Sequence, residues 1–289
     1  MFSLPVERNI KLSSYTTFKI GGPADYFFLA KNENDLIKII NEAKAEKINY
    51  LVLGNGSNIL ISDDGFKGLI IKLEMNSISI EGEKILADAG LKIGDLLSKA
   101  KESGLSGLEF LSGIPATVGG AVWANAGSDK ENIGNIITRI TVINSSGEIK
   151  EINKEEAQFK YRDSIFKHQD LIILKAELKL NKADIKEIEN KMKVCMEKKI
   201  QAQELNKPSI GSIFKNPEGE KKAWELIEQV GMRGYKMGGA QVSEKHANFI
   251  INTGTATASD VIMLISLIKQ KVRDTLGVQL MEEIKYIGF

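Results

Sequence analysis

The sequence has very few of the residues that form disulfides and metal sites. Its 289 residues include one cysteine, Cys195, and two histidines, His168 and His246. A lone cysteine cannot form an intramolecular disulfide, and neither histidine has a partner at metal-ligand spacing. We therefore expect no metal site, and the chemistry must come from other side chains or from a bound organic cofactor.

The sequence also lacks a charge imbalance and long apolar runs. Lysine and arginine number 39 against 38 aspartate and glutamate, so the net charge of +1 predicts no general attraction to nucleic acid or anionic membranes. No apolar stretch approaches the roughly 20 residues that span a bilayer, and the N-terminal residues lack the pattern of a secretion signal. We expect a cytoplasmic monomer that binds neither nucleic acid nor membrane.

The chain is long for a single core, and its N-terminal part reads as a small α/β unit over residues 1–75. Asn34 is expected to open a helix in which Leu36, Ile40 and Ala43 share one face. Short apolar runs bounded by turn residues predict strands, at 50–53, 59–61 and 68–73.

Two further units are predicted. Residues 76–185 contain short alternating runs separated by turns and read as β-rich. Residues 186–289 begin within a charged connecting helix and contain a second helix that Thr257 or Ser259 can cap and Gly277 ends. The expected fold class is therefore α+β, with a separate C-terminal domain.

Two glycine-rich loops stand out. The first, Gly54, Asn55, Gly56, Ser57 and Asn58, joins two apolar runs, and its backbone N–H groups could cradle phosphate oxygens. It lacks the lysine of a P-loop and runs into a strand, so alone it reads as a surface turn. The second, SGIPATVGGAVWANAG at 112–127, lets the backbone approach a flat ligand closely. Together the two loops suggest a dinucleotide.

Seven stretches in order make the pattern specific, and they cover nearly the whole chain: TTFKIGGPADYF, GNGSNILISDDGFKGLIIKL, GLEFLSGIPATVGGAVWANAG, FKYRDSIF, GSIFKNP, GGAQVSEKHANFIIN and EIKYIG. In this set the sequence resembles the UDP-N-acetylenolpyruvoylglucosamine reductase family, in its shorter, second type. The resemblance implies FAD bound between two N-terminal subdomains of the vanillyl-alcohol-oxidase type, with substrate carried on the C-terminal domain.

The resemblance also assigns cofactor contacts. Residues 54–58 would cradle the FAD pyrophosphate, with Thr17 and Gly21 nearby. The second loop would line the flavin and its phosphates through eight residues, Gly113, Ile114, Pro115, Thr117, Val118, Gly119, Gly120 and Ala121.

The family reaction needs cationic support and a proton donor. NADPH reduces the flavin, hydride passes to C3 of the enolpyruvyl ether, and charge develops at C2 and in the carboxylate. Arg162 matches the arginine that can clamp a carboxylate through two parallel hydrogen bonds. Ser212 matches the serine that protonates C2, and a nearby cation, Lys215, could ease loss of its proton.

A glutamate near the C-terminus completes the family's catalytic set, and two residues compete for the role. Alignment on IKYIG selects Glu283. A final strand over 278–289 would instead favour Glu282, which shares a face with the apolar residues of that strand. We follow the motif, because a bulge can shift a face.

The sugar-nucleotide substrate would contact Lys215, Asn216 and His246 by the same resemblance, although His246 reads equally well as a structural histidine. Two rivals stay open. One is a flavin oxidase of another small substrate on the same scaffold, which the C-terminal motifs disfavour. The other is a binding module without activity, for which Arg162, Ser212 and Glu283 would be unnecessary.

Overall fold

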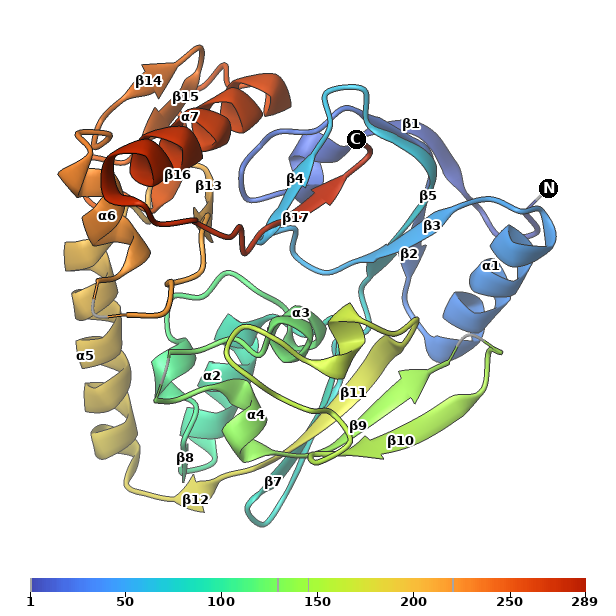
Figure 1. The fold of residues 1–289 in the computed structure, drawn as a ribbon. Helices are drawn as coiled ribbons and strands as arrows, with labels where there is room; N and C mark the ends of the chain where they lie inside the picture. The colour runs from blue at the N-terminus through green and yellow to red at the C-terminus, as the bar shows by residue number, and fades with distance from the viewer. Residues whose placement is uncertain (1, 129, 145, 220) are drawn as a thin grey trace. The chain divides into compact units, whose positions relative to one another are not determined.

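The computed structural model describes residues 2–128, 130–144, 146–219 and 221–289. The chain combines helices with largely antiparallel sheets (Figure 1), which confirms the α+β class. Within the described residues, no helix is both long and apolar enough to cross a membrane.

The strands are β1 (Glu7–Lys11), β2 (Pro23–Ala30), β3 (Tyr50–Leu53), β4 (Ile59–Ile61), β5 (Phe66–Leu73), β6 (Ile78–Glu81), β7 (Lys84–Asp88), β8 (Leu105–Ser106), β9 (Ile137–Ile143), β10 (Ile149–Asn153), β11 (Ile172–Lys179), β12 (Asn181–Lys182), β13 (Ser209–Ser212), β14 (Lys236–Met237), β15 (Ala240–Val242), β16 (Phe249–Asn252) and β17 (Lys285–Ile287). The α-helices are α1 (Glu33–Ala45), α2 (Ile93–Glu102), α3 (Val118–Ala124), α4 (Ile133–Ile136), α5 (Ile185–Ala202), α6 (Ala223–Gln229) and α7 (Ala258–Leu276).

The chain divides into two compact units, each made of segments that are distant in the sequence. Unit 1 consists of Met1–Glu7, Tyr26–Asn55 and Gly68–Lys198, and unit 2 of Arg8–Asp25, Gly56–Lys67 and Lys199–Phe289. The division at 75 and 185 that the sequence suggests, into two FAD-binding subdomains and a substrate domain, stays a prediction.

Helix α1 forms where the apolar pattern predicts it, but it starts earlier. Asn32 caps the helix, because its side-chain oxygen accepts a hydrogen bond from the backbone N–H of Asp35 at 2.9 Å. The prediction that Asn34 opens the helix is therefore wrong by two residues. The predicted face is buried, with Leu36 and Ile40 packed in the core of unit 1 beside strand β5.

Unit 1 is organised around an antiparallel sheet in the order β10-β9-β11-β7-β6. Helix α3 contacts β11 and β7 (Figure 1), and its residues Val118, Ala121 and Val122 are fully buried. The apolar side chains of this helix join those of the sheet in one core. The sheet therefore fixes α3, and with it the second glycine-rich loop.

Unit 2 contains a four-stranded sheet in the order β13-β16-β15-β14, with α7 against β14, β15 and α6 (Figure 1). Thr257 caps α7 by accepting from the N–H of Asp260 at 3.0 Å, and Gly277 ends it at a φ of 69°. One of the two predicted caps and the predicted end of this helix are therefore confirmed.

The predicted C-terminal strand is much shorter in the structure. Only Lys285–Ile287 form a strand, β17, which pairs in parallel with β4. The preceding residues 278–284 have irregular backbone, joined to the sheet region by a single bridge between Phe214 and Glu282. Leu280 and Ile284 are buried in the core of unit 2, so the apolar alternation of this segment comes from core packing rather than from a sheet.

Candidate active site

The loop of residues 54–58 joins β3 to β4, as predicted. Its backbone carbonyl oxygens and its backbone N–H groups differ in whether they have hydrogen-bond partners. Its carbonyl oxygens at Gly54, Gly56 and Asn58 accept hydrogen bonds from Lys72 Nζ, the N–H of Thr17 and the N–H of Lys285. Among the described residues, the backbone N–H groups of 55–57 have no hydrogen-bond partner. Consecutive free N–H groups suit the oxygens of a pyrophosphate, so this loop fits the FAD that the sequence implies.

Two glycines of this loop have no room for a side chain. A Cβ on Gly54 would lie 2.7 Å from Thr117 Oγ1, and one on Gly56, whose φ is 62°, would lie 2.4 Å from the carbonyl oxygen of Tyr15. Asn55 Nδ2 donates to the carbonyl oxygen of Pro115 at 2.7 Å. In unit 1 the structure thus brings the start of the first loop against the second.

Lys72 lies behind the first loop and was not foreseen from the sequence. Its Nζ donates to the carbonyl oxygen of Gly54 at 2.8 Å. Burial lowers the pKa of this ammonium group and Lys92 adds to the shift, while Glu74 opposes it. A lysine inside the apolar run of β5 was the available signal, because a buried cation needs a partner.

The second loop uses its backbone N–H groups internally. Thr117 Oγ1 accepts from the N–H of Gly120 at 3.3 Å, and the N–H groups of Val118 and Gly119 donate to the carbonyl oxygens of Leu91 and Ala89. The first turn of α3 therefore has these donors already engaged. Contact with the flavin through the shape of residues 113–121 stays a prediction, but their N–H groups at 118–120 are not available for phosphate.

Arg162 lies in a tight turn of unit 1. Its φ is 52°, a left-handed conformation that is uncommon for a residue with a side chain and that clusters at functional sites. Lys160 and Asp163 exchange two backbone hydrogen bonds across the turn, at 3.0 and 3.1 Å. Asn125 Nδ2, at the end of α3, donates to the carbonyl oxygen of Lys160 at 2.8 Å. The half-buried guanidinium therefore projects from a fixed turn.

Ser212 ends strand β13 in unit 2, at an irregularity in the sheet. The pairing of β13 with β16 shifts register between Ser209 and Ser212, and Gly211 has a φ of 79°. Thr17 Oγ1 donates to the carbonyl oxygen of Ser209 at 2.7 Å, which places this predicted neighbour beside the strand. A bulge of this kind re-aims the side chain that follows it.

The structure separates the two competing glutamates. The N–H of Glu283 donates to the carbonyl oxygen of Ile213 at 2.8 Å, and its carbonyl oxygen accepts from Asn58 Nδ2 at 3.4 Å. Glu282 instead forms an ion pair with Lys269 of α7 at 2.8 Å. Since 278–284 is not a strand, the alternation argument for Glu282 does not apply, and Glu283 is the glutamate joined to the residue after Ser212.

The predicted substrate residues also lie in unit 2. The N–H of Lys215 donates to the carbonyl oxygen of Met281 at 2.9 Å, and Asn216 Oδ1 accepts from the N–H of Ala223 at 3.2 Å. The ring of His246 lies 4.7 Å from that of Phe249, between centroids.

Burial lowers the pKa of His246 to about 4, and the nearby guanidinium of Arg233 adds to the shift. Its buried Nδ1 has no hydrogen-bond partner among the described residues. The imidazole is therefore neutral at pH 7. This environment is that of a packed, uncharged ring, although contact with substrate stays a prediction.

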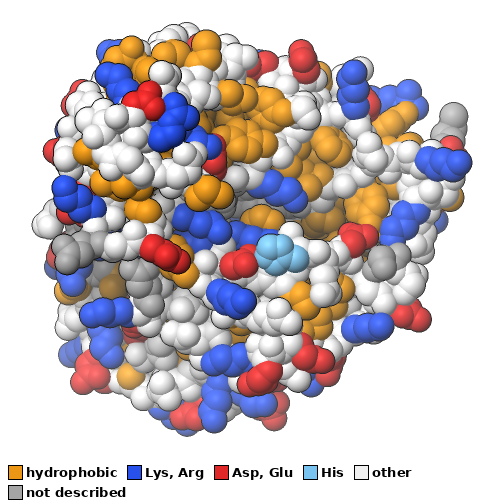
Figure 2. Space-filling model, in the orientation of Figure 1, with side chains coloured by type: hydrophobic (Ala, Val, Ile, Leu, Met, Phe, Trp, Pro, Cys, Tyr) orange, Lys and Arg blue, Asp and Glu red, His pale blue; other side chains and the backbone are white. Residues whose placement is uncertain are grey.

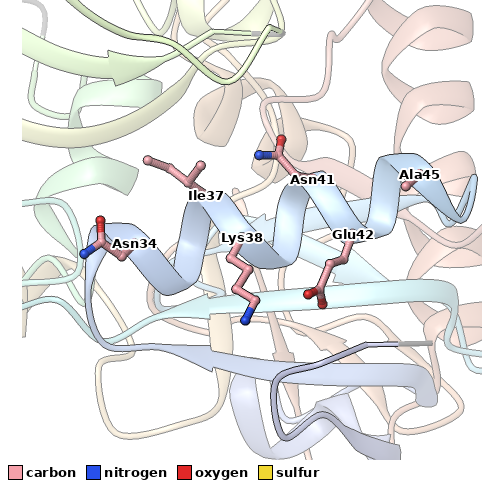
Figure 3. A pocket seen from close by; sticks show the side chains of 6 residues that line it. All are labelled: Asn34, Ile37, Lys38, Asn41, Glu42 and Ala45. Atoms are coloured by element: carbon pink, nitrogen blue, oxygen red, sulfur yellow. The ribbon is translucent and has the colours of Figure 1, made fainter.

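Neither of two surface hollows is lined by Arg162, Ser212 or Glu283. One follows the outer face of α1, where Asn34, Ile37, Asn41 and Ala45 line one side of the helix (Figure 3). Another, in unit 2, lies along α7 and includes Glu282. On the face drawn in Figure 2, basic and acidic side chains are interspersed, in line with the net charge of +1.

Ser212, Glu283 and Asn58 are therefore brought together within unit 2, and Gly54 and Asn55 meet Pro115 and Thr117 within unit 1. Arg162 belongs to unit 1, and its meeting with Ser212 is a prediction.

Comparison with known sequences shows which protein family the chain belongs to. Residues 203–287 match the sequence model of the UDP-N-acetylenolpyruvoylglucosamine reductase C-terminal domain, and residues 24–153 match that of an FAD binding domain. The chain is 46% identical over 288 residues to the UDP-N-acetylenolpyruvoylglucosamine reductase of Carboxydothermus hydrogenoformans, covering 99% of this chain and 95% of the relative. The chain belongs to this reductase family.

Other members agree. UDP-N-acetylenolpyruvoylglucosamine reductase 1 of Bacillus anthracis is 40% identical over 96% of this chain and 93% of its own. The crystal structure of the Thermus caldophilus reductase superposes with a TM-score of 0.84 at 33% identity, over 98% of this chain and 99% of that one. The expected family, the FAD cofactor and the oxidoreductase class are thereby confirmed, with an FAD-binding domain followed by a C-terminal domain.

Proposed function

We propose that the protein reduces UDP-N-acetylglucosamine enolpyruvate to UDP-N-acetylmuramate, with NADPH as the reductant, in the synthesis of peptidoglycan precursors. The observation that carries the proposal is the link from Ser212 through Ile213 to Glu283, inside the region that matches the reductase C-terminal domain. Bound FAD supplies hydride transfer, from NADPH to C3 of the enolpyruvyl group.

Ser212 is the proposed donor of the proton that C2 receives. It lies at the end of β13, after a bulge, and a bulge can re-aim the side chain that follows it. A hydroxyl is a weak acid, so the transfer requires a strongly basic carbon and a nearby cation, for which Lys215 is proposed. Glu283 places a carboxyl group on the neighbouring segment, as the third member of the set.

Arg162 is the proposed partner of the substrate carboxylate. Its guanidinium can donate two parallel hydrogen bonds and stabilise the charge that develops during reduction. The fixed turn around it limits the orientational freedom that binding would otherwise have to remove.

The pyrophosphate of FAD is assigned to the N–H groups of residues 55–57, with the engaged second loop as a wall. Asn216 and His246 are proposed contacts of the sugar nucleotide. The monomeric state and the cytoplasmic location stay predictions.

The test separates the two half-reactions. The purified holoprotein should lose its yellow colour with NADPH and regain it with UDP-N-acetylglucosamine enolpyruvate. Ser212→Ala should leave the first step at the wild-type rate and slow the second by about 10²- to 10⁴-fold, the usual contribution of a general acid.

Ser266→Ala, at an exposed position of α7 in the same unit, is the matched control and should retain both steps. Equal loss of both half-reactions in Ser212→Ala would contradict the role of Ser212. A wild-type flavin that bleaches but is not reoxidised by this substrate would instead favour an oxidoreductase of another small substrate on the same scaffold.

A further inference from the structure

The sheet fixes Ser212 only in part, because Ser212 pairs with Phe249 of β16 as the last residue of β13. A bulge interrupts the ladder between β13 and β16, and the strand ends at Ser212. The next three residues, Ile213, Phe214 and Lys215, leave the regular pairing. Because a bulge leaves the local ladder disrupted, other groups must hold this segment.

The side chain of Asn248 takes over where the ladder stops. Its Nδ2 donates to the carbonyl oxygen of Phe214 at 2.8 Å, and its Oδ1 accepts from the N–H of Phe214 at 2.9 Å. Its own backbone carbonyl oxygen accepts from the N–H of Ile213 at 2.9 Å. Asn248 is 4% exposed, so water does not compete effectively for these bonds.

The same short segment also holds the backbone around Glu283. The carbonyl oxygen of Ile213 accepts from the N–H of Glu283, and the N–H of Lys215 donates to the carbonyl oxygen of Met281. A shift of Ile213 and Phe214 would therefore move Ser212, Lys215 and Glu283 together.

We propose that Asn248 is a positioning residue for the reduction of substrate, which fixes Ser212 and Glu283 through Phe214 and Ile213. This inference rests on the proposed function. Asn248 has no assigned contact with substrate or cofactor, and it acts through the backbone it holds.

An asparagine is suited to this role by its chemistry. Its amide group offers one acceptor and a donor side by side, as a peptide group does, so it can replace a pair of ladder hydrogen bonds. An alanine would leave the N–H and C=O of Phe214 buried without partners, and an aspartate would set a carboxylate oxygen against the carbonyl oxygen of Phe214.

The turn that presents Asn248 is itself braced. Ser243 Oγ accepts from the N–H groups of Lys245 and His246, and it donates to Glu204 Oε2 at 3.1 Å. Ser243 is fully buried and Glu204 is 8% exposed. The amide of Asn248 therefore projects from a segment with little freedom of its own.

Stopped-flow measurement of the two half-reactions tests the proposal on the holoprotein. Asn248→Ala should leave flavin reduction by NADPH at the wild-type rate and slow reoxidation by UDP-N-acetylglucosamine enolpyruvate about 100-fold, the loss expected for a misplacement of about 1 Å. Should Asn248→Ala not yield folded holoprotein, Asn248→Asp, which keeps an acceptor for the N–H of Phe214, should slow the same step at least about tenfold.

Asn252→Ala is the matched control. Asn252 lies on β16, is 6% exposed, and bonds through its side chain to the carbonyl oxygen of Phe18 and the N–H groups of Gly254 and Ala256. Its replacement removes three side-chain hydrogen bonds, against two in Asn248→Ala, and none of the three involves residues 212–215. Equal slowing of reoxidation in both variants would overturn the proposal, as would a wild-type rate in Asn248→Ala.

Hydrogen exchange distinguishes this inference from the proposed function. Asn248→Ala should accelerate amide exchange of Ile213, Phe214 and Lys215, and Asn252→Ala should not. If the wild-type protein fails to be reoxidised by this substrate, the proposed function fails. The positioning of the segment by Asn248 is then judged by exchange alone, and unchanged protection of Phe214 refutes it.

Discussion

The two polar segments of the proposed site are held by groups of different charge. In unit 1 the loop that begins at Gly54 is held by the half-buried ammonium of Lys72, while the segment after Ser212 in unit 2 is held by the neutral amide of Asn248. A cation behind free N–H groups favours an anion such as pyrophosphate. A neutral clamp fixes geometry without adding charge beside a serine that must release a proton and a glutamate nearby.

The largest effect should come from Glu283, the carboxylate beside the segment that Asn248 holds. Glu283→Gln keeps the backbone bonds of the segment and removes the ionisable carboxyl, so reoxidation by substrate should slow by about 10²- to 10⁴-fold in stopped flow. Glu282→Gln removes only the pair with Lys269, which is worth at most about 1 kcal/mol at this exposure, and should retain the rate. The reverse order of effects would reassign the catalytic glutamate.

The lack of space for a side chain at Gly56 should distinguish the first loop from an ordinary surface turn. Gly56→Ala puts a Cβ within 2.4 Å of the carbonyl oxygen of Tyr15, so the loop must move and FAD affinity should fall about 100-fold, or nearly 3 kcal/mol. Gly82→Ala has the same left-handed strain, with a φ of 61°, but no atom within 4 Å. Fluorescence titration with FAD measures both, and equal affinities would show that strain alone matters.

The buried histidine of unit 2, His246, should make the stability of the protein depend on acid pH. The pKa of His246 is about 4 in the folded protein and about 6.5 when unfolded, so the unfolded chain binds more protons between these values. The free energy of unfolding therefore decreases as the pH is lowered from about 6.5 toward 4. The contribution lost from pH 7 to pH 5 is about 2 kcal/mol, some 30-fold in the unfolding constant.

Urea unfolding at the two pH values measures this loss. His246→Phe should reduce the acid sensitivity by that amount. Identical pH dependence of His246→Phe and the wild type would argue against a neutral, buried imidazole.

The smallest expected effect tests the cation of unit 1. Lys72→Met removes the hydrogen bond to Gly54 and a positive charge, and should weaken FAD binding about tenfold, in line with the worth of a charged hydrogen bond. Lys67→Met changes an exposed lysine of the same strand and should keep the wild-type dissociation constant. Equal weakening in both would assign the effect to general electrostatics.

Local signals in the sequence predicted much of this fold. The buried face of α1 and the cap and end of α7 follow from periodicity and from residues within one turn of each other. The glycine loops were detectable because close backbone approach excludes side chains, as at Gly54 and Gly56.

The groups that hold the loops were not predictable in the same way. Lys72 acts on a residue 18 positions away and Asn248 on one 34 positions away, and neither spacing has a local signature. Periodicity predicted a strand in the segment before β17 that the structure does not contain. Leu280 and Ile284 are buried there, and their spacing is the same as the alternation of a strand. Only the family motif selected Glu283.

The two hydrogen bonds of the Asn248 side-chain amide also make the segment after Ser212 depend on the identity of one atom, Nδ2. Deamidation would exchange a single NH₂ group for oxygen and leave the size of the side chain almost unchanged. Attraction toward the carbonyl oxygen of Phe214 would become repulsion in a buried place. A deamidated protein could thus keep its fold and its bound flavin while the hydroxyl of Ser212 is displaced from its position for proton transfer.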